Sequence, residues 1–296
     1  MPPTLAPFPT PITCEPVTCR RELGACPVAN RPLAEAQHAL LARLGKPDHA
    51  VYMRSDAWVA PADLERLAAA PAPAALRDAA GVALAWSAAS PRGPAESAES
   101  LAAGAESLLI RYPWDLLRVN ELLLAAVRSP DLCGELSPLA TVEGILVLGE
   151  GSRVLPGVFI EGTVVIGRHC KIGPNCYLRG ATAIGDDCHI GQAVEIKNSI
   201  LMNGVGMGHL SYCGDSIVGQ NTNFGAGTIT ANFRHDGACH RSLAGGRLVD
   251  TGRRKLGAII GDGVHTGIHT SIYPGRKLWP GVATRPGEVV QTDLTG

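Results

Sequence analysis

The chain has 296 residues, with 26 Lys and Arg against 27 Asp and Glu and a formal net charge of −1. This balance argues against a nucleic-acid or anionic-membrane partner, because both favour a strongly positive field. The longest apolar stretch near a helical pattern, 122–127, is far shorter than the ~20 residues of a membrane span. The N-terminus has no basic start followed by an apolar core, as a signal peptide would. We expect a cytoplasmic protein with no membrane partner, whose nine Cys stay reduced.

The first part of the chain predicts a small α/β domain behind a leader. Residues 1–22 carry six Pro, which predicts an extended and poorly ordered segment. Helical patterns follow over 33–44, 61–70 and 113–128. A short buried strand is expected at 50–53, whereas Ala, Pro and Ser dominate 71–104 and no pattern there predicts a structure. We therefore expect the α/β domain to span 23–136.

The second part, from residue 137 to residue 296, follows a different rule. Six of the 35 Gly precede residue 140 and 29 follow it. Aliphatic residues then recur every six positions over nine repeats, at Leu148, Val154, Ile160, Ile166, Ile172, Leu178, Ile184, Ile190 and Ile196. Two residues earlier lies a second inward set, namely Val158, Val164, Cys170, Cys176, Thr182, Cys188 and Val194. A period of six is neither that of a strand nor that of a helix, and it predicts short strands that alternate with turns.

This pattern resembles the left-handed parallel β-helix of hexapeptide-repeat acyltransferases. The resemblance implies a mainly β fold, in which three hexads close one triangular coil and equivalent residues of successive coils stack on each other. Cys170 and Cys188 should then stack inside the coil as small apolar core residues. The period breaks between Met202 and Val218. It resumes at Val218 and Phe224, and again at Ile260, Thr266, Ile272 and Leu278.

Two cations stand out in the regular repeats. Arg179 and Lys197 are one coil apart on one face, where neighbouring strands lie ~4.8 Å apart. Like charges at that distance repel each other unless an anion lies between them, and a phosphate fits both side chains. The alternative is structural, because Glu161 lies one coil below Arg179 and Glu195 is close to Lys197. Spacing alone leaves both interpretations open.

The broken segment 206–216 contains a His and a Tyr. A Gly-rich interruption of a solenoid is a common place for function, although a single loop His such as His209 is more often only solvated. The run Gly225–Gly227 follows between Asn223 and Asn232, and it offers backbone N–H groups for a carbonyl or phosphate oxygen.

Together these residues resemble the acetyltransferase domain of GlmU-type bifunctional enzymes over about 148–287. The resemblance is strongest to the archaeal-type sugar-1-phosphate nucleotidylyltransferase/acetyltransferases. It is carried by Arg179, Lys197, His209–Tyr212, Gly214–Asp215, Asn223, Gly225–Thr230 and Asn232. It implies an acetyl-CoA-dependent N-acetyltransferase of nucleotide-sugar biosynthesis that acts on an amino-sugar phosphate similar to glucosamine 1-phosphate. It also implies a homotrimer with coenzyme A thioester as co-substrate.

The resemblance implies a role for each residue. His209 would be the general base, since an imidazole can accept the proton of an attacking amine near neutral pH. The sugar and its phosphate would be bound by Arg179, Lys197, Tyr212 and Asn223. Acetyl-CoA would be held by Asn232, Ala226 and Gly227. One departure is Phe233, where the family usually has Tyr. The insertion 233–255 is rich in cations and either reaches the coenzyme A phosphates or is a solvated loop.

The first part of the chain faintly resembles a nucleotidyltransferase. The similar segments are Cys26–Leu33 and Pro113–Leu117, and Asp56 and Asn120 lie where that family binds its metal. The Gly-rich loop that would cradle a triphosphate is missing, so we expect a shortened and degenerate domain. Two alternatives remain: retained nucleotidyl transfer from UTP or dTTP with Mg²⁺, and a non-catalytic sugar-nucleotide-binding scaffold. The sequence names neither the amino sugar nor the acyl group.

Overall fold

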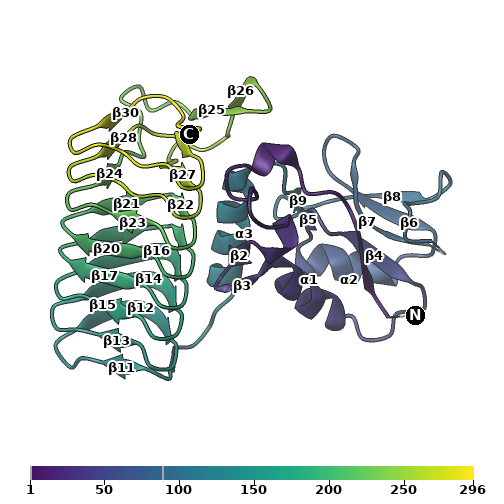
Figure 1. Cartoon of the computed structure of the whole chain (residues 1–296). Coiled ribbons are helices and arrows are strands. Elements are labelled where there is room, and N and C mark those ends of the chain that lie inside the picture. The colour runs from purple at the N-terminus through teal and green to yellow at the C-terminus, as the bar shows by residue number, and fades with distance from the viewer. Residues whose placement is uncertain (1, 89) are drawn as a thin grey trace. The chain divides into compact units, whose positions relative to one another are not determined.

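The computed structural model describes residues 2–88 and 90–296, which form two compact units (Figure 1). The first unit consists of residues 1–11, 22–26 and 31–111, and the second of residues 12–21, 27–30 and 112–296. The predicted boundary at 136 is therefore too late, because the third helix clusters with the β-helix. No helix of the described residues is long and apolar enough to cross a membrane.

The first unit is built on a five-stranded sheet. Its strand order is β1 (Thr4–Ala6), β4 (Val51–Arg54), β7 (Ala83–Ser87), β6 (Ala74–Arg77) and β8 (Glu99–Ala102). The other elements are η2 (Leu23–Ala25), β3 (Arg31–Pro32), α1 (Leu33–Ala42), β5 (Ala57–Trp58), α2 (Pro61–Ala69) and β9 (Leu108–Leu109). The expected poorly ordered leader is wrong for 4–6, because β1 pairs in parallel with β4 and so obtains its hydrogen bonds from the sheet. Buried Trp86 packs against Tyr52 with ring centroids 6.1 Å apart.

Three short segments precede the β-helix in the second unit. They are η1 (Ile12–Cys14), β2 (Pro27–Val28) and α3 (Pro113–Ala125). Proline occupies the first turn of α3, and the Asp115 carboxylate accepts a hydrogen bond from the Tyr112 N–H at 2.9 Å. The apolar face of α3 lies against β14 and β16 of the β-helix (Figure 1). Part of the leader packs here as well, since Arg21 forms an ion pair of 2.7 Å with Asp262 and Val17 is buried.

The rest of the second unit is a left-handed parallel β-helix, as predicted (Figure 1). One side is a six-stranded parallel sheet of β11 (Glu135–Leu136), β13 (Arg153–Val154), β15 (Lys171–Ile172), β17 (His189–Gln192), β20 (Gly206–His209) and β23 (Asn223–Phe224). The larger sheet begins with β10 (Asp131–Leu132), β12 (Thr141–Leu148), β14 (Phe159–Ile166), β16 (Tyr177–Ile184), β18 (Glu195–Lys197), β19 (Ile200–Leu201) and β21 (Tyr212–Gly214). It continues with β22 (Ile217–Val218), β24 (Ile229–Thr230), β27 (Ile259–Ile260), β28 (Ser271–Ile272), β29 (Lys277–Leu278) and β30 (Val289–Val290).

The predicted core of the β-helix is confirmed. All nine aliphatic positions of the hexad repeat are at most 2% exposed, and so are the seven positions of the second inward set. Cys170 and Cys188 stack as expected, with the Cys188 N–H 3.4 Å from the Cys170 sulfur. Contact with Cys170 and burial raise the pKa of Cys188 far above its usual value. Burial also raises the pKa of Cys176 to about 11, so the Cys176 and Cys188 thiols stay protonated and pack as small apolar core residues.

The predicted break between residues 202 and 218 is wrong. In the lower coils Arg179 pairs with Lys197, three hexads along the chain. The same spacing would pair Lys197 with Asp215, but its register partner is Gly214. The coil therefore continues with one residue fewer per turn, and we call the coils below β18 the long coils and those from β18 to β24 the short coils. The missing residue moves the inward positions out of the six-residue period, which looks like an interruption in the sequence, although the strands stay in register.

The true interruption follows β24. Ile217 pairs with Ile259, more than two coil lengths along the chain, because the chain leaves the coil and returns. This excursion carries an antiparallel hairpin of β25 (Arg241–Ala244) and β26 (Arg247–Asp250). Its two ends meet in an isolated bridge between Phe233 and Lys255, which are the bounds of the predicted basic insertion. The spacing of three hexads then resumes, since Ile259 pairs with Lys277.

Candidate active site

The predicted site residues lie on β21 (Tyr212–Gly214), on the strands stacked with it, and at the two corners of the coil at its ends. His209 ends β20 in the six-stranded sheet, and Tyr212 begins β21 in the larger sheet. Between them Leu210 turns the chain at a φ of 51°, and the Ser211 hydroxyl donates to the His209 carbonyl at 2.8 Å. The corner one coil above contains Gly227, whose N–H donates to the same carbonyl at 3.2 Å. Hydrogen bonds from its own corner and the next thus fix the backbone that carries His209.

The His209 side chain is exposed to solvent. Gly208 beside it leaves open space, because a Cβ there would meet no atom within 4 Å. His189 lies on the strand below, and burial lowers its pKa, with the charges of Lys171 and His209 lowering it further. An exposed imidazole beside a bare backbone position can be reached by a ligand.

Arg179 and Lys197 are register neighbours on adjacent strands, as predicted. Each already has a carboxylate partner. Arg179 donates to Glu195 through Nε at 2.8 Å and Nη2 at 2.7 Å, while Lys197 Nζ lies 3.1 and 2.8 Å from the two oxygens of Asp215. Glu195 therefore neutralises a cation, as the structural interpretation proposed. Glu161 does not, because it accepts a hydrogen bond from the Tyr177 hydroxyl. The phosphate clamp remains a prediction.

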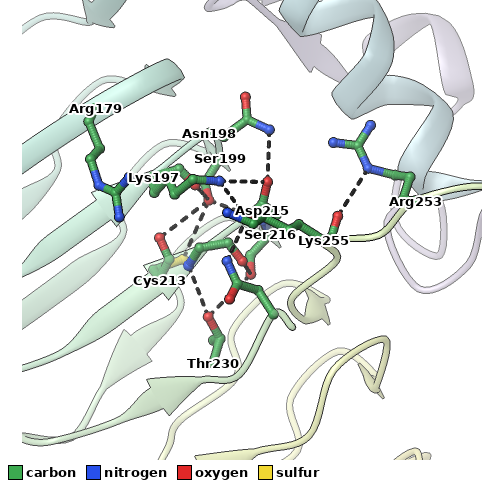
Figure 2. Close-up of polar contacts among 12 residues, drawn as sticks. Arg179, Lys197, Asn198, Ser199, Cys213, Asp215, Ser216, Thr230, Arg253 and Lys255 are labelled. Carbon is green, nitrogen blue, oxygen red and sulfur yellow. Dashed lines mark hydrogen bonds and ion pairs between the residues drawn. The ribbon is translucent and has the colours of Figure 1, made fainter. Parts of the chain in front are cut away.

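Asp215 is an acceptor shared by Lys197 and two asparagine side chains (Figure 2). Its side chain is only 4% exposed and accepts from Lys197, from Asn198 Nδ2 at 3.0 Å and from Asn232 Nδ2 at 2.6 Å. Sequence reasoning did not single out Asn198, because a strict hexad register stacks it with Ser216. The register of the short coils stacks it with Asp215 instead.

Tyr212 adjoins the same group. Asn232 Nδ2 donates to the Tyr212 hydroxyl at 2.9 Å. Burial, and then the charges of Asp215 and Glu195, raise the pKa of Tyr212. The phenol therefore stays protonated, and its own hydrogen is available for another acceptor.

The remaining residues of the expected sugar and coenzyme sites are only partly free. Gly225 N–H and Gly227 N–H already donate to Thr266 and His209. For Ala226 N–H no partner is found among the described residues. Asn223 is exposed, one strand above Gly206. Near the start of the excursion lies a cavity of about 560 Å³, which is lined by Ala231, Phe233, Arg234, His235, Asp236, Tyr273 and Pro274.

The two expected metal ligands of the first part of the chain are engaged elsewhere. Both Asp56 oxygens accept from Arg54, at 2.7 and 2.8 Å. Asn120 accepts from the Ala29 N–H at 2.8 Å and donates to the Ala181 carbonyl at 3.0 Å. They also belong to different compact units. Among the described residues no group of three or more His, Cys, Asp or Glu side chains could hold a metal ion.

The similarity to known proteins is found in the β-helix part of the chain. Residues 154–275 match the family model of the GMPPB C-terminal domain. A bifunctional sugar-1-phosphate nucleotidylyltransferase/acetyltransferase of Sulfurisphaera tokodaii is 39% identical over 185 residues, which are 62% of this chain and 46% of that protein. A bifunctional protein GlmU of Methanococcus maripaludis is 52% identical over 169 residues, 57% of this chain and 41% of that protein. The resemblance to the archaeal GlmU-type proteins is confirmed.

Each match covers only part of this chain and part of the related protein. The chain spans about half the length, or less, of the curated relatives that it matches. Among solved structures, a UDP-N-acetylglucosamine acyltransferase aligns with 14% identity and a TM-score of 0.27, over 55% of this chain and 68% of that one. A perosamine N-acetyltransferase from Caulobacter crescentus, solved with CoA and GDP-perosamine, aligns with 17% identity and a TM-score of 0.22, over 62% of each chain.

Proposed function

We propose that the chain is an acetyl-CoA-dependent N-acetyltransferase that acts on an amino-sugar phosphate. The observation that carries the proposal is the placement of the predicted site residues on neighbouring parts of the coil. An exposed His209 ends β20 at the corner before β21, and Tyr212, Lys197 and Arg179 lie on stacked strands of the sheet that follows this corner. The sequence of this β-helix is similar to part of a protein named a bifunctional sugar-1-phosphate nucleotidylyltransferase/acetyltransferase.

His209 is the proposed general base. It accepts the proton of the substrate amine while the nitrogen lone pair attacks the thioester carbonyl carbon. The Ala226 N–H is available to stabilise the oxyanion that forms. The C–S bond then breaks, the amide remains on the sugar, and coenzyme A leaves as the thiol after it takes up a proton.

The cations are the proposed phosphate clamp. Arg179 uses Nε and Nη2 on Glu195, so Nη1 is left for a ligand. Lys197 has three N–H donors and directs two of them at Asp215. Each cation therefore keeps at least one donor for a phosphate oxygen, while its carboxylate partner holds it in place.

The test is thiol release from acetyl-CoA across a panel of amino-sugar 1-phosphates and the matching unphosphorylated amino sugars. We expect release with at least one phosphorylated amino sugar, and light scattering should give the mass of a homotrimer. Binding of sugar nucleotides without thiol release would instead identify a non-catalytic scaffold. A stable monomer at micromolar concentration would contradict the trimer.

A further inference from the structure

Asp215 lies at a corner of the coil where the backbone is left-handed. Its φ is 50°, and that of Asn198, its neighbour one short coil below, is 49°, so two left-handed residues stack at one corner. Asp and Asn tolerate this conformation better than most residues. The backbone is held on both sides, because Asp215 N–H donates to the Lys197 carbonyl at 2.8 Å and Gly257 N–H donates to the Asp215 carbonyl at 2.9 Å.

The donors around the carboxylate are arranged so that each one fixes a further group. Asn232 directs one amide hydrogen to Asp215 at 2.6 Å and the other to the Tyr212 hydroxyl at 2.9 Å. Both hydrogens are thereby used, so the Tyr212 oxygen must accept and its own hydrogen must point elsewhere. Lys197, bonded to both carboxylate oxygens, is likewise confined to one orientation of its ammonium group.

From this arrangement we propose that Asp215 is the positioning residue of the site. It orients Lys197 towards the phosphate and, through Asn232, the Tyr212 hydroxyl towards the amino sugar. The proposal rests on the proposed acetyl transfer and adds a group that does not itself touch the substrate.

The network also reaches α3 and the excursion. The second amide hydrogen of Asn198 goes to Glu121 Oε1 of α3 at 2.9 Å. The same oxygen accepts from Arg253 Nη2 at 2.5 Å, near the end of the excursion. Arg253 therefore supports the sugar-phosphate side of the site through Glu121 and Asn198. This gives one cation of the basic insertion a role that does not involve coenzyme A.

The first test replaces Asp215 by Asn, which keeps the shape but removes one acceptor oxygen and the charge. We expect kcat/KM for the phosphorylated amino sugar to fall by roughly 10–100-fold, since small displacements of positioned groups have effects of this size. The KM for acetyl-CoA should change little. The matched control is Asp262→Asn, because Asp262 is 8% exposed, is ion-paired with Arg21 and lies at another corner. That variant should lower the melting temperature without changing kcat/KM.

A double-mutant cycle separates positioning from mere stability. If Asp215 acts through Tyr212, Asp215→Asn and Tyr212→Phe together should reduce kcat/KM by little more than the worse single variant. Multiplicative losses would overturn the proposal. So would an Asp215→Asn enzyme that melts lower but has unchanged kinetics for the sugar.

Arg253→Gln provides a milder variant in case Asp215→Asn does not fold. We expect a smaller loss in the same direction, confined to the KM of the amino-sugar phosphate. Arg254→Gln is its control, because the Arg254 side chain donates to the Gly237 carbonyl rather than to Glu121. A rise confined to the KM of acetyl-CoA would overturn the proposed role of Arg253. A wild-type protein without thiol release would remove the proposed function together with this inference, whereas an active wild type with unaffected variants would remove the inference alone.

Discussion

The long coils of the β-helix differ from the short coils by a single residue per turn, and all the proposed site residues except Arg179 lie in the short ones. In a long coil Asp215 would be the register partner of Lys197 and would point outward beside it. In the short coil Gly214 takes that place, and Asp215 moves to the corner. A Cβ at Gly214 would lie 2.3 Å from the Tyr212 hydroxyl and 2.7 Å from Asn232 Nδ2. The short coil thus has a glycine at this strand position, and the side chains of Tyr212 and Asn232 occupy the space that a Cβ would fill.

Among the variants that test the difference between short and long coils, we expect the largest loss of activity at His209. His209→Ala should lower kcat by ~10²–10⁴, the usual cost of removing a general base. Steady-state thiol release beside a melting curve measures this. His169→Asn is the control, since His169 is an exposed residue with a φ of 56° at a corner of a long coil. If His209→Ala keeps wild-type turnover, the short coils do not carry the base.

Gly214→Ala tests whether the glycine position of the short coil is needed for activity. The added methyl group should displace the ends of Tyr212 and Asn232, and we expect kcat/KM to fall by roughly 10–100-fold. The protein should still fold, because both clashing groups are the ends of side chains that can move. Gly208→Ala, where a Cβ meets nothing within 4 Å, is the control for the melting temperature. Full activity in Gly214→Ala would show that the open position is incidental.

Lys197→Ala should have a smaller and more selective effect. Loss of a ground-state charge contact should raise the KM for the phosphorylated amino sugar by ~10-fold and leave kcat nearly unchanged. The unphosphorylated amino sugar should be unaffected. Arg153→Ala, which removes an exposed cation 3.0 Å from Glu135, is the control. Equal losses for both sugars would favour a structural column of charges over a phosphate clamp.

The first unit should contribute least to the chemistry. We expect no release of pyrophosphate from UTP or dTTP with sugar 1-phosphates, because the Gly-rich loop is missing and Asp56 is ion-paired with Arg54. Asp56→Ala should lower the melting temperature and leave acetyl transfer within ~2-fold of wild type. Pyrophosphate release that Asp56→Ala abolishes would establish a second active site.

Periodic features were predictable from the sequence and irregular ones were not. The nine aliphatic positions, the three helices and the strand near 50–53 follow from local pattern, because each repeats a burial requirement at fixed spacing. The strands β6, β7 and β8 were missed in 71–104, where tertiary pairing outweighs an Ala- and Pro-rich composition. The partners of Asp215 were hidden by the change from long to short coils, since contacts between coils depend on a register that no single hexad reveals.

The excursion has a consequence for engineering and for divergence. Since Phe233 and Lys255 lie side by side, the loop leaves and re-enters the solenoid at nearly one point, and its length places no strain on the coils. The entropy of closing such a loop grows only slowly with its length. The exposed tip of the hairpin at Gly245 and Gly246 should therefore tolerate insertion of a foreign hairpin, a fluorescent module or an affinity peptide. The base of the excursion is different, because buried His240 bonds to the Asn232 carbonyl and Arg253 ties the return segment to α3. An insertion that preserves both contacts should leave catalysis intact.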